Sequence, residues 1–256
     1  MDNKNIYEKY DWESLKEEHL IGKIGKILES IPDDVSSIVD IGCGNGVITN
    51  ILNKKFDIVA VDRSEKALKY VNTKKIKADA DSIPLEDSSF DIVFSSELLE
   101  HLPSDILKGT ISEFKRLSKK YILITVPNSE NPDKLSIVCP ECGYLYNSPN
   151  HLRSFDIKKL TNFFPEYKLI NTFTFGKRVR YYNRNILKLK TKFAPPKSWI
   201  PYYWMPKEKR KTTCPSCEFT FENPYKFNLL SLGFDLLNII ASPKKPYWLF
   251  ALFEKV

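Results

Sequence analysis

A glycine-rich turn directly follows the first apolar run of the chain, and residues 39–46 read Val39-Asp40-Ile41-Gly42-Cys43-Gly44-Asn45-Gly46. The run that leads into it, residues 37–41, is short and stops at glycines, as a buried parallel strand does. Helical spacing resumes over 47–52. Glycines suit such a turn because the backbone must bend sharply and a ligand must approach it closely. The stretch therefore predicts a strand, a ligand-binding turn and a helix.

Strands and helices alternate on both sides of this turn. Apolar runs predict six further strands, at 56–61, 75–78, 90–95, 121–126, 167–175 and 247–253. Helical spacing separates them at 65–71, 104–117, 156–164 and 229–239. This alternation predicts a doubly wound, mostly parallel seven-stranded α/β sheet with helices on both faces, which is a Rossmann-like fold.

The chemistry of the turn narrows the choice of ligand. A dinucleotide fingerprint would place its third glycine at Val47, whereas here Gly46 follows Gly44 at a spacing of two. Asp40 lies at the strand end, where a carboxylate can meet a cationic amino-acid group. Both features favour S-adenosylmethionine. An NAD-binding oxidoreductase and a tight turn without a ligand are the alternatives.

Five short motifs occur in a fixed order along the first half of the chain. They are the glycine turn with Asp40, the acid Asp62 that ends strand two, Asp79-Ala80 with Ile83-Pro84, Phe90-Asp91-Ile92-Val93, and Glu100-His101-Leu102. In this order and spacing the sequence resembles the class I S-adenosylmethionine-dependent methyltransferases, in particular the type 11 small-molecule group similar to the quinone-biosynthesis enzymes. The resemblance covers about residues 39–175, and Ile83 stands where the group has leucine.

The resemblance implies a cofactor site at the carboxyl edge of the sheet. It places the methionine end of S-adenosylmethionine at Asp40, Gly42, Cys43, Gly44, Asn45 and Gly46. It assigns the ribose to Asp62, with Arg63 beside it, and the adenine edge to Asp79 and the backbone of Ala80. Ser95 and Ser96, which end the fourth strand, would lie beside the sulfonium, with an ordinary polar strand end as the alternative.

Two histidines are candidates for the base that removes a proton from the methyl acceptor. His101 follows the fourth strand and His151 follows the fifth, at the edge where open α/β sheets bind ligands. For His101, a structural role that anchors the next helix is the favoured interpretation. For His151, a catalytic role is favoured, because loops after parallel strands face ligands.

Two cysteine pairs predict a second site. Cys139-Pro140-Glu141-Cys142 and Cys214-Pro215-Ser216-Cys217 are both C-P-x-C knuckles, and together they offer four thiolates to one tetrahedral ion. We expect a shared structural zinc; a redox-active pair and unpaired buried cysteines are the alternatives. A four-sulfur site has no open position, so this zinc would not activate the acceptor.

The expected organisation is a single methyltransferase domain over 1–256 with three added parts. Residues 1–32 form an N-terminal helical cap, whose helix is expected to start at the capping-box spacing Ser14-x-x-Glu17. Residues 139–155 hold the first knuckle and an acceptor loop. Residues 176–224 form a basic insertion that ends with the second knuckle. A shared zinc would pin this insertion beside His151 as a wall of the acceptor site.

Charge is concentrated in the insertion. Residues 176–212 contain eight lysines and four arginines against one acid, Glu208, in a chain of formal net charge +7. This asymmetry indicates a surface for an anionic partner, with a solvated lysine-rich loop as the alternative. We expect a small anionic acceptor, such as a sugar or glycolipid precursor. RNA is the second choice, because no N-P-P-[YF] motif follows strand four, and a non-catalytic cofactor-binding scaffold is the third.

Composition places the chain among globular proteins, with 42% apolar and 28% charged residues. Its first residues lack the apolar region of a signal peptide. The most apolar helix candidate, 228–241, is too short to span a bilayer and contains Asp235. We therefore expect no transmembrane segment, a cytoplasmic location and reduced cysteines. The sequence does not specify an oligomeric state.

Overall fold

The computed structural model describes residues 4–147, 149–194, 211–222 and 228–256, and the chain divides into two compact units. The sheet unit comprises residues 2–128, 155–177 and 246–256, and the cysteine unit comprises residues 129–154 and 178–245. The cysteine unit contains most of the expected segments 139–155 and 176–224 and has wider bounds. Of the expected insertion, residues 195–210, 223 and 224 lie outside the described residues, as do residues 1–3 of the expected cap.

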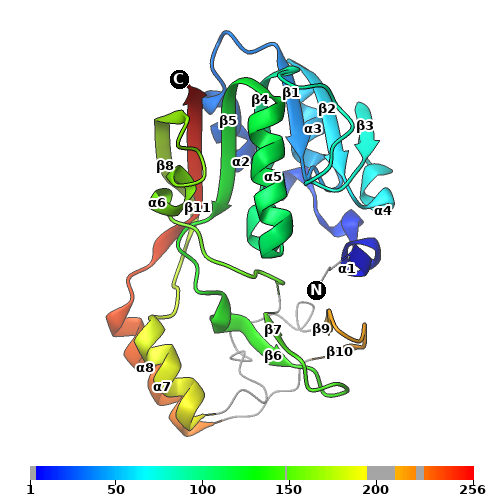
Figure 1. Cartoon of the computed structure of the whole chain (residues 1–256). Coiled ribbons are helices and arrows are strands. Elements are labelled where there is room, and N and C mark those ends of the chain that lie inside the picture. Colours follow the sequence, from blue (N-terminus) through cyan, green and yellow to red (C-terminus); the bar gives the residue numbers. More distant parts are fainter. Residues whose placement is uncertain (1–3, 148, 195–210, 223–227) are drawn as a thin grey trace. The chain divides into compact units, whose positions relative to one another are not determined.

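The sheet unit is built on the predicted seven-stranded sheet (Figure 1). Its strand order is β3-β2-β1-β4-β5-β11-β8. The strands are β1 (Ser37–Ile41), β2 (Asp57–Asp62), β3 (Lys74–Lys77), β4 (Phe90–Ser96), β5 (Ser118–Pro127), β8 (Tyr167–Val179) and β11 (Lys245–Lys255). The pairs among β3, β2, β1, β4 and β5 are parallel, and β11 runs antiparallel to β5. The predicted fold class is therefore confirmed.

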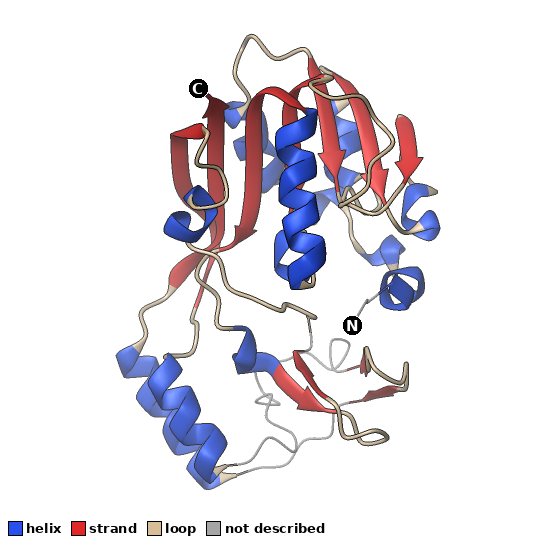
Figure 2. Cartoon of the chain, in the orientation of Figure 1, coloured by secondary structure: helices blue, strands red, loops and turns tan. Residues whose placement is uncertain are grey.

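Helices cover both faces of this sheet (Figure 2). They are α1 (Lys4–Lys9), α2 (Ile21–Ser30), α3 (Val47–Leu52), α4 (Glu65–Leu68), α5 (Ser104–Leu117) and α6 (Ile157–Thr161), with short 3-10 turns at Trp12–Ser14, Glu17–His19 and Leu99–His101. Successive strand residues face opposite sides: Val39 packs in the cluster of α5 and α6, and its neighbour Ile38 packs in the cluster of α2 and α3. Strands buried on both faces explain the unbroken apolar runs in the sequence.

The N-terminal cap differs from its prediction. The helix expected from Ser14 to residue 31 is shorter than predicted. Only Ile21–Ser30 is α-helical, and the residues before it contain the two 3-10 turns at Trp12–Ser14 and Glu17–His19. The Ser14 hydroxyl donates a 2.8 Å hydrogen bond to the Asp11 carbonyl and caps no helix. The capping-box spacing therefore belongs to a turn. The sequence also predicts Ser104 as the cap of the helix after the fourth strand, but Pro103 is in the cap position and Ser104 is the first residue of α5.

In its described residues the cysteine unit contains two small hairpins and two helices. The hairpins are β6 (Ser136–Val138) with β7 (Leu145–Asn147) and β9 (Lys211–Thr213) with β10 (Thr220–Glu222), and both are antiparallel. A 3-10 turn at Pro132–Leu135 precedes β6. The helices are α7 (Arg184–Phe193) and α8 (Leu229–Ala241). Helix α7 and both hairpins were not predicted. Among the described residues, no helix has the length and apolar character needed to cross a membrane.

Candidate functional site

The glycine turn joins β1 to α3 at the carboxyl edge of the sheet. Gly42, Gly44 and Gly46 all have positive φ, at +78°, +55° and +73°. This left-handed region is costly for residues with a Cβ atom. At Gly44 a Cβ would also lie 2.8 Å from the Trp12 ring, and at Gly46 it would lie 2.8 Å from Val71. The backbone conformation of the turn and the close approach of Trp12 and Val71 therefore both require glycine here.

Asp40 lies beneath this turn, almost fully buried at 2% exposure. Its carboxylate accepts a 2.6 Å hydrogen bond from the Thr49 hydroxyl on α3. Burial raises the pKa of Asp40 to about 7, against the opposing effect of that hydrogen bond. A buried carboxylate with an elevated pKa is ready to be stabilised by an added cation.

Asp62 ends β2 and is held by two backbone amides. Gly44 N–H donates to one carboxylate oxygen and Ser64 N–H to the other, each at 2.8 Å. Burial raises the pKa of Asp62, and these two hydrogen bonds oppose the rise. Each carboxylate oxygen retains a further lone pair for a ligand hydroxyl. Next to it, Arg63 Nε lies 3.0 Å from the Asp79 carboxylate, so the structure brings together these two predicted cofactor residues.

Ser95 and Ser96 are tied into the sheet at the end of β4. The buried Ser95 hydroxyl donates a 2.9 Å hydrogen bond to the Ile41 carbonyl, which joins β4 to β1 just below the glycine turn. The Ser96 hydroxyl accepts a 3.0 Å hydrogen bond from Thr125 on β5. Both serines therefore have a structural role at the strand ends.

Two buried polar atoms near the turn have no hydrogen-bond partner among the described residues. They are Asn45 Oδ1 and the Tyr7 hydroxyl. The Asn45 amide nitrogen is fixed, because it donates to the carbonyls of Trp12 and Leu15 at 2.7 and 2.9 Å. Unpartnered buried polar atoms are rare in proteins and are commonly satisfied by a bound ligand or water. Together with Asp40 and Asp62, they form a set of acceptors that fits the amino-acid and ribose groups of S-adenosylmethionine.

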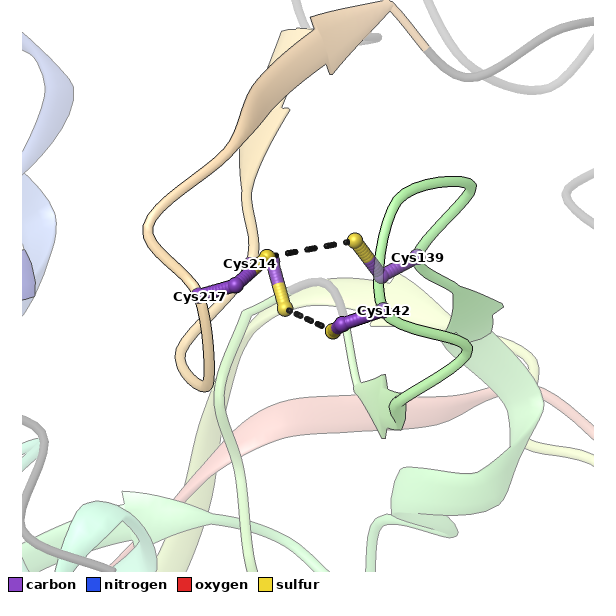
Figure 3. Close-up of side chains that lie close together, drawn as sticks. All are labelled: Cys139, Cys142, Cys214 and Cys217. Atoms are coloured by element: carbon purple, nitrogen blue, oxygen red, sulfur yellow. Dashed lines mark hydrogen bonds between the residues drawn. The ribbon is translucent and has the colours of Figure 1, made fainter.

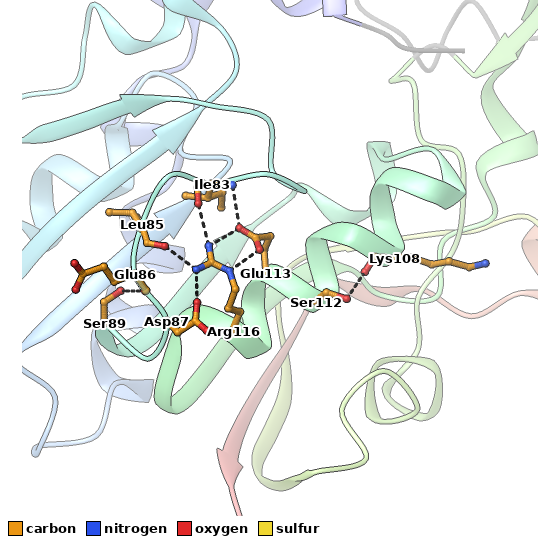
Figure 4. A network of polar contacts seen from close by, with 9 residues as sticks. All are labelled: Ile83, Leu85, Glu86, Asp87, Ser89, Lys108, Ser112, Glu113 and Arg116. Atoms are coloured by element: carbon orange, nitrogen blue, oxygen red, sulfur yellow. Dashed lines mark hydrogen bonds and ion pairs between the residues drawn. The ribbon is translucent and has the colours of Figure 1, made fainter.

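An arginine network holds the loop that carries Asp79 and Ala80 (Figure 4). The Arg116 guanidinium on α5 donates to the carbonyls of Leu85 and Ile83 at 2.6 and 2.9 Å. It also contacts the carboxylates of Asp87 and Glu113, each at 2.7 Å. These carboxylates raise the pKa of Arg116 further. The loop between β3 and β4 is therefore fixed at several points to one helix.

Comparison with known proteins agrees with this geometry. Residues 39–122, from the glycine turn into β5, match the family model of the methyltransferase domain. The sheet unit therefore contains a methyltransferase domain with the fold of the class I S-adenosylmethionine-dependent methyltransferases. This identification decides between the two cofactors that the glycine turn alone left open. The methyltransferase match ends within β5, so it does not include the cysteine unit.

Three relatives of the methyltransferase illustrate the extent of the similarity. The solved structure of an S-adenosylmethionine-dependent methyltransferase from Archaeoglobus fulgidus shares the fold, with a TM-score of 0.58 at 16% identity over 94% of this chain and 95% of that chain. An uncharacterized protein of Methanocaldococcus jannaschii is 27% identical over 169 residues, which is 60% of this chain and 72% of the relative. The 27-O-demethylrifamycin SV methyltransferase of Amycolatopsis mediterranei is 33% identical over 79 residues, which is 26% of this chain and 29% of that enzyme.

The two candidate histidines lie in different units. In the sheet unit, His101 ends a 3-10 turn after β4, and its ring meets Tyr7 edge-on at 6.0 Å between centroids. Its Nε2 lies 3.9 Å from the buried carboxylate of Glu100. In the cysteine unit, His151 is buried, and its Nδ1 contacts the buried carboxylate of Glu130.

Three charged residues in these surroundings are not predicted by any pattern in the sequence. One is Glu130, the carboxylate partner of His151, which lies 21 positions before it. The others are Lys23 on α2 and Glu97 just after β4, which form a 3.1 Å ion pair. The Lys23 side chain is 1% exposed, and burial lowers its pKa while Glu97 favours the charged form. The periodicity of α2 predicts that position 23 is near the buried face, but no local signal reveals its distant partner.

The four knuckle cysteines come together in the cysteine unit (Figure 3). All four Sγ atoms lie within 4.8 Å of one another. Sγ of Cys139 lies 3.6 Å from that of Cys217, and Sγ of Cys142 lies 3.6 Å from that of Cys214. A disulfide would need about 2.05 Å. Sulfurs bound to one tetrahedral zinc at about 2.3 Å are separated by roughly 3.8 Å, so the arrangement suits that ion.

Proposed function

We propose that the chain transfers the methyl group of S-adenosylmethionine to a small, anionic acceptor such as a sugar, a glycolipid or another biosynthetic precursor. The observation that carries the anionic character is the charge of the cysteine unit. Its described residues contain eleven lysines and arginines against six acids, and the stretches 178–194 and 228–245 hold eight of these bases against one acid, Asp235. A small-molecule acceptor is also what the name of the Amycolatopsis relative states for that enzyme.

The predicted cofactor residues would divide the work of binding. We propose that Asp40 meets the ammonium group of the methionine end and that Asp62 accepts the ribose hydroxyls. Asn45 Oδ1 and the Tyr7 hydroxyl are further groups available to the cofactor. When bound, S-adenosylmethionine supplies an activated methyl group for in-line displacement. Asp79 with the backbone of Ala80 is the proposed adenine contact, and the Arg116 network would hold that loop in place.

His151 is our first candidate for the general base, and His101 is the second. A carboxylate beside a histidine ring nitrogen holds one tautomer and leaves the other nitrogen to accept a proton. His151 has such a partner in Glu130. We also propose that the cysteine unit is an insertion in the methyltransferase domain, because the chain enters and leaves it twice between elements of the sheet unit.

The central experiment measures methyl transfer by the full chain. Purified protein is incubated with methyl-labelled S-adenosylmethionine and either a phosphate- and sugar-rich small-molecule extract or total RNA. We expect label in the small-molecule fraction, with release of S-adenosylhomocysteine. The change His151→Ala should lower turnover by about 100-fold, and His19→Ala is the matched control, since His19 is an exposed histidine. Label confined to RNA would overturn the proposed acceptor class.

We further propose that the four cysteines bind one structural zinc ion. The support is the 3.6 Å sulfur separation and the common geometry of the two knuckles. A thiolate site also suits a reducing compartment, which favours the expected cytoplasmic location. Metal analysis of the purified chain should give one zinc per molecule. A change of Cys142→Ser should remove it, Cys43→Ser should keep it, and zinc below about half an equivalent would contradict the site.

A further inference from the structure

Helix α8 is inverted: its polar side chains point inward and most of its apolar side chains point outward, with Leu232 and Phe234 half-buried. Asn238 is its one buried residue, and the side chain of Asp235 is 11% exposed. In contrast, Ile240 is 86% exposed and Leu229 is 74% exposed. A surface helix of a globular protein normally has the opposite arrangement. Since these side chains stay exposed in the part of the chain that the structure describes, the pattern calls for a partner with an apolar surface.

Polar contacts with α7 and the segment before it fix the rotation of α8. The Asp235 carboxylate accepts 2.6 Å hydrogen bonds from the Tyr182 hydroxyl and from the buried Lys190 ammonium. Asn238 Oδ1 accepts a 2.8 Å hydrogen bond from the Asn183 amide. A rotation that buried the leucines would break all three bonds and leave Lys190 without its carboxylate. The outward apolar face is thus a property of the folded unit.

This apolar face is broad and continuous. It consists of six exposed residues, Leu229, Leu230, Leu236, Leu237, Ile239 and Ile240. At roughly 100° per residue they cover about half of the helix circumference. A helix of 13 residues is about 20 Å long, which is too short to cross a bilayer. It is long enough to lie in the interface of one leaflet.

Several cations lie on helix α7 and at the carboxyl end of α8. Arg184, Lys188 and Lys192 recur every four residues on the exposed side of α7, with exposed Leu189 and Phe193 beside them. At the far end of α8, Arg180 donates to the Ile239 carbonyl at 2.6 Å. Arg178 donates to the carbonyl of Lys244, and Lys244 and Lys245 are exposed. Positive charge therefore lies on the helix that packs against α8 and at the carboxyl end of α8.

We infer that α7 and α8 dock the protein on an anionic phospholipid surface. The leucines and isoleucines of α8 enter the interface, and the lysines and arginines meet the phosphate groups. Charge complementarity favours this partner over a second copy of the chain, because two copies would bring the same cations together. The inference concerns docking alone and does not depend on the acceptor of the methyl group.

The test is flotation of the full, metal-loaded chain with vesicles. We expect binding to vesicles of phosphatidylcholine mixed with phosphatidylglycerol, little binding to phosphatidylcholine alone, and weaker binding at high salt. The change Ile240→Asn should reduce the bound fraction at least about tenfold. Ile21→Asn is the matched control, because Ile21 is an isoleucine of the sheet unit with 63% exposure. Circular dichroism and S-adenosylhomocysteine binding confirm that each variant is folded.

A charge variant keeps the test decisive if Ile240→Asn does not fold. Lys188→Gln with Lys192→Gln changes only exposed residues and should lower binding to the mixed vesicles, whereas Lys54→Gln with Lys69→Gln should not. Absence of binding to the mixed vesicles would overturn the inference. An equal loss of vesicle binding with the control change Ile21→Asn would overturn the inference as well. Self-association that Ile240→Asn abolishes, without vesicle binding, would instead assign the face to a second copy.

Discussion

Asp40 combines three properties that seldom occur together at a strand end. Its side chain is buried, its carboxylate has one hydrogen-bond donor in Thr49, and its pKa is raised to about 7. In the ligand-free protein the folded state therefore holds a proton that the unfolded chain releases at a lower pH. This residue makes the free protein less stable as pH rises from about 4 to about 7. A bound ammonium group would stabilise the ionised carboxylate of Asp40 and so remove this loss of stability.

The pH dependence of cofactor binding follows from this property. Because the ammonium group favours the ionised carboxylate, the affinity for S-adenosylhomocysteine should rise up to tenfold per pH unit below about pH 7 and level off above it. The change Asp40→Asn should leave a shallower profile, since Asp62 with its raised pKa still titrates, and should weaken binding at neutral pH by roughly 10- to 100-fold. Calorimetric titration between about pH 5.5 and 8.5 measures both effects. Asp57→Asn, an exposed strand residue, is the control and should keep the wild-type profile.

The two knuckles are the same structural element in duplicate. In each, the amide four residues after the first cysteine donates a 3.0 Å hydrogen bond back to that cysteine's carbonyl, from Gly143 to Cys139 and from Glu218 to Cys214. Both donors have positive φ, +72° at Gly143 and +60° at Glu218. The turn thus requires a left-handed residue at this position, and the first knuckle meets the requirement with glycine.

A pair of glycine substitutions separates conformation from packing. A Cβ at Gly143 or at Gly25 would meet no atom within 4 Å. Gly143→Ala should still destabilise the cysteine unit by about 1 kcal/mol, because of its positive φ. Gly25→Ala, within helix α2, should stabilise the sheet unit by about 0.5–1 kcal/mol. Denaturant unfolding measures both changes, and a stabilising Gly143→Ala would contradict the turn geometry.

Short-range patterns predicted much of these elements, and long-range pairing accounts for what they missed. The strands of the sheet, the turn at Gly42–Gly46 and the cysteine knuckles follow from spacing over a few residues. The partners of His151 and Lys23 do not, because Glu130 and Glu97 are distant in the sequence. The periodicity of α8 was visible, but the sequence could not show that its polar face is the buried one.

At the scale of the whole molecule, two units with different sources of stability share one chain. The sheet unit has two large apolar clusters on either side of its sheet. The cluster around the cysteines contains Ile137, Tyr146, Cys139 and Cys214, with Phe221 packed against it. A second cluster, Tyr182 and Leu187 with Ile186 packed against them, lies in the same unit. Cores as small as these two, formed by the described residues of the unit, are usually supplemented by a metal or by cross-links. We therefore expect the units to respond differently to the loss of zinc.

Chelation should separate the two units in a thermal scan. Removal of zinc should lower the unfolding temperature of the cysteine unit by roughly 10 °C or more, since metal binding contributes directly to folding. The affinity of the sheet unit for S-adenosylhomocysteine should change by less than about twofold. Differential scanning calorimetry with and without a chelator tests this. A single transition that shifts as a whole would show that the units unfold cooperatively.

The position of β11 in the sheet has a consequence during synthesis. This strand lies between β5 and β8, yet it follows both of them in the chain. On the ribosome, the edges of β5 and β8 that later pair with β11 therefore stay open, that of β5 while residues 128–244 are translated and that of β8 while residues 180–244 are translated. All four knuckle cysteines lie between the end of β5 and the start of β11. The four cysteines for which we propose a zinc ion are thus all present before the last strand of the sheet is translated.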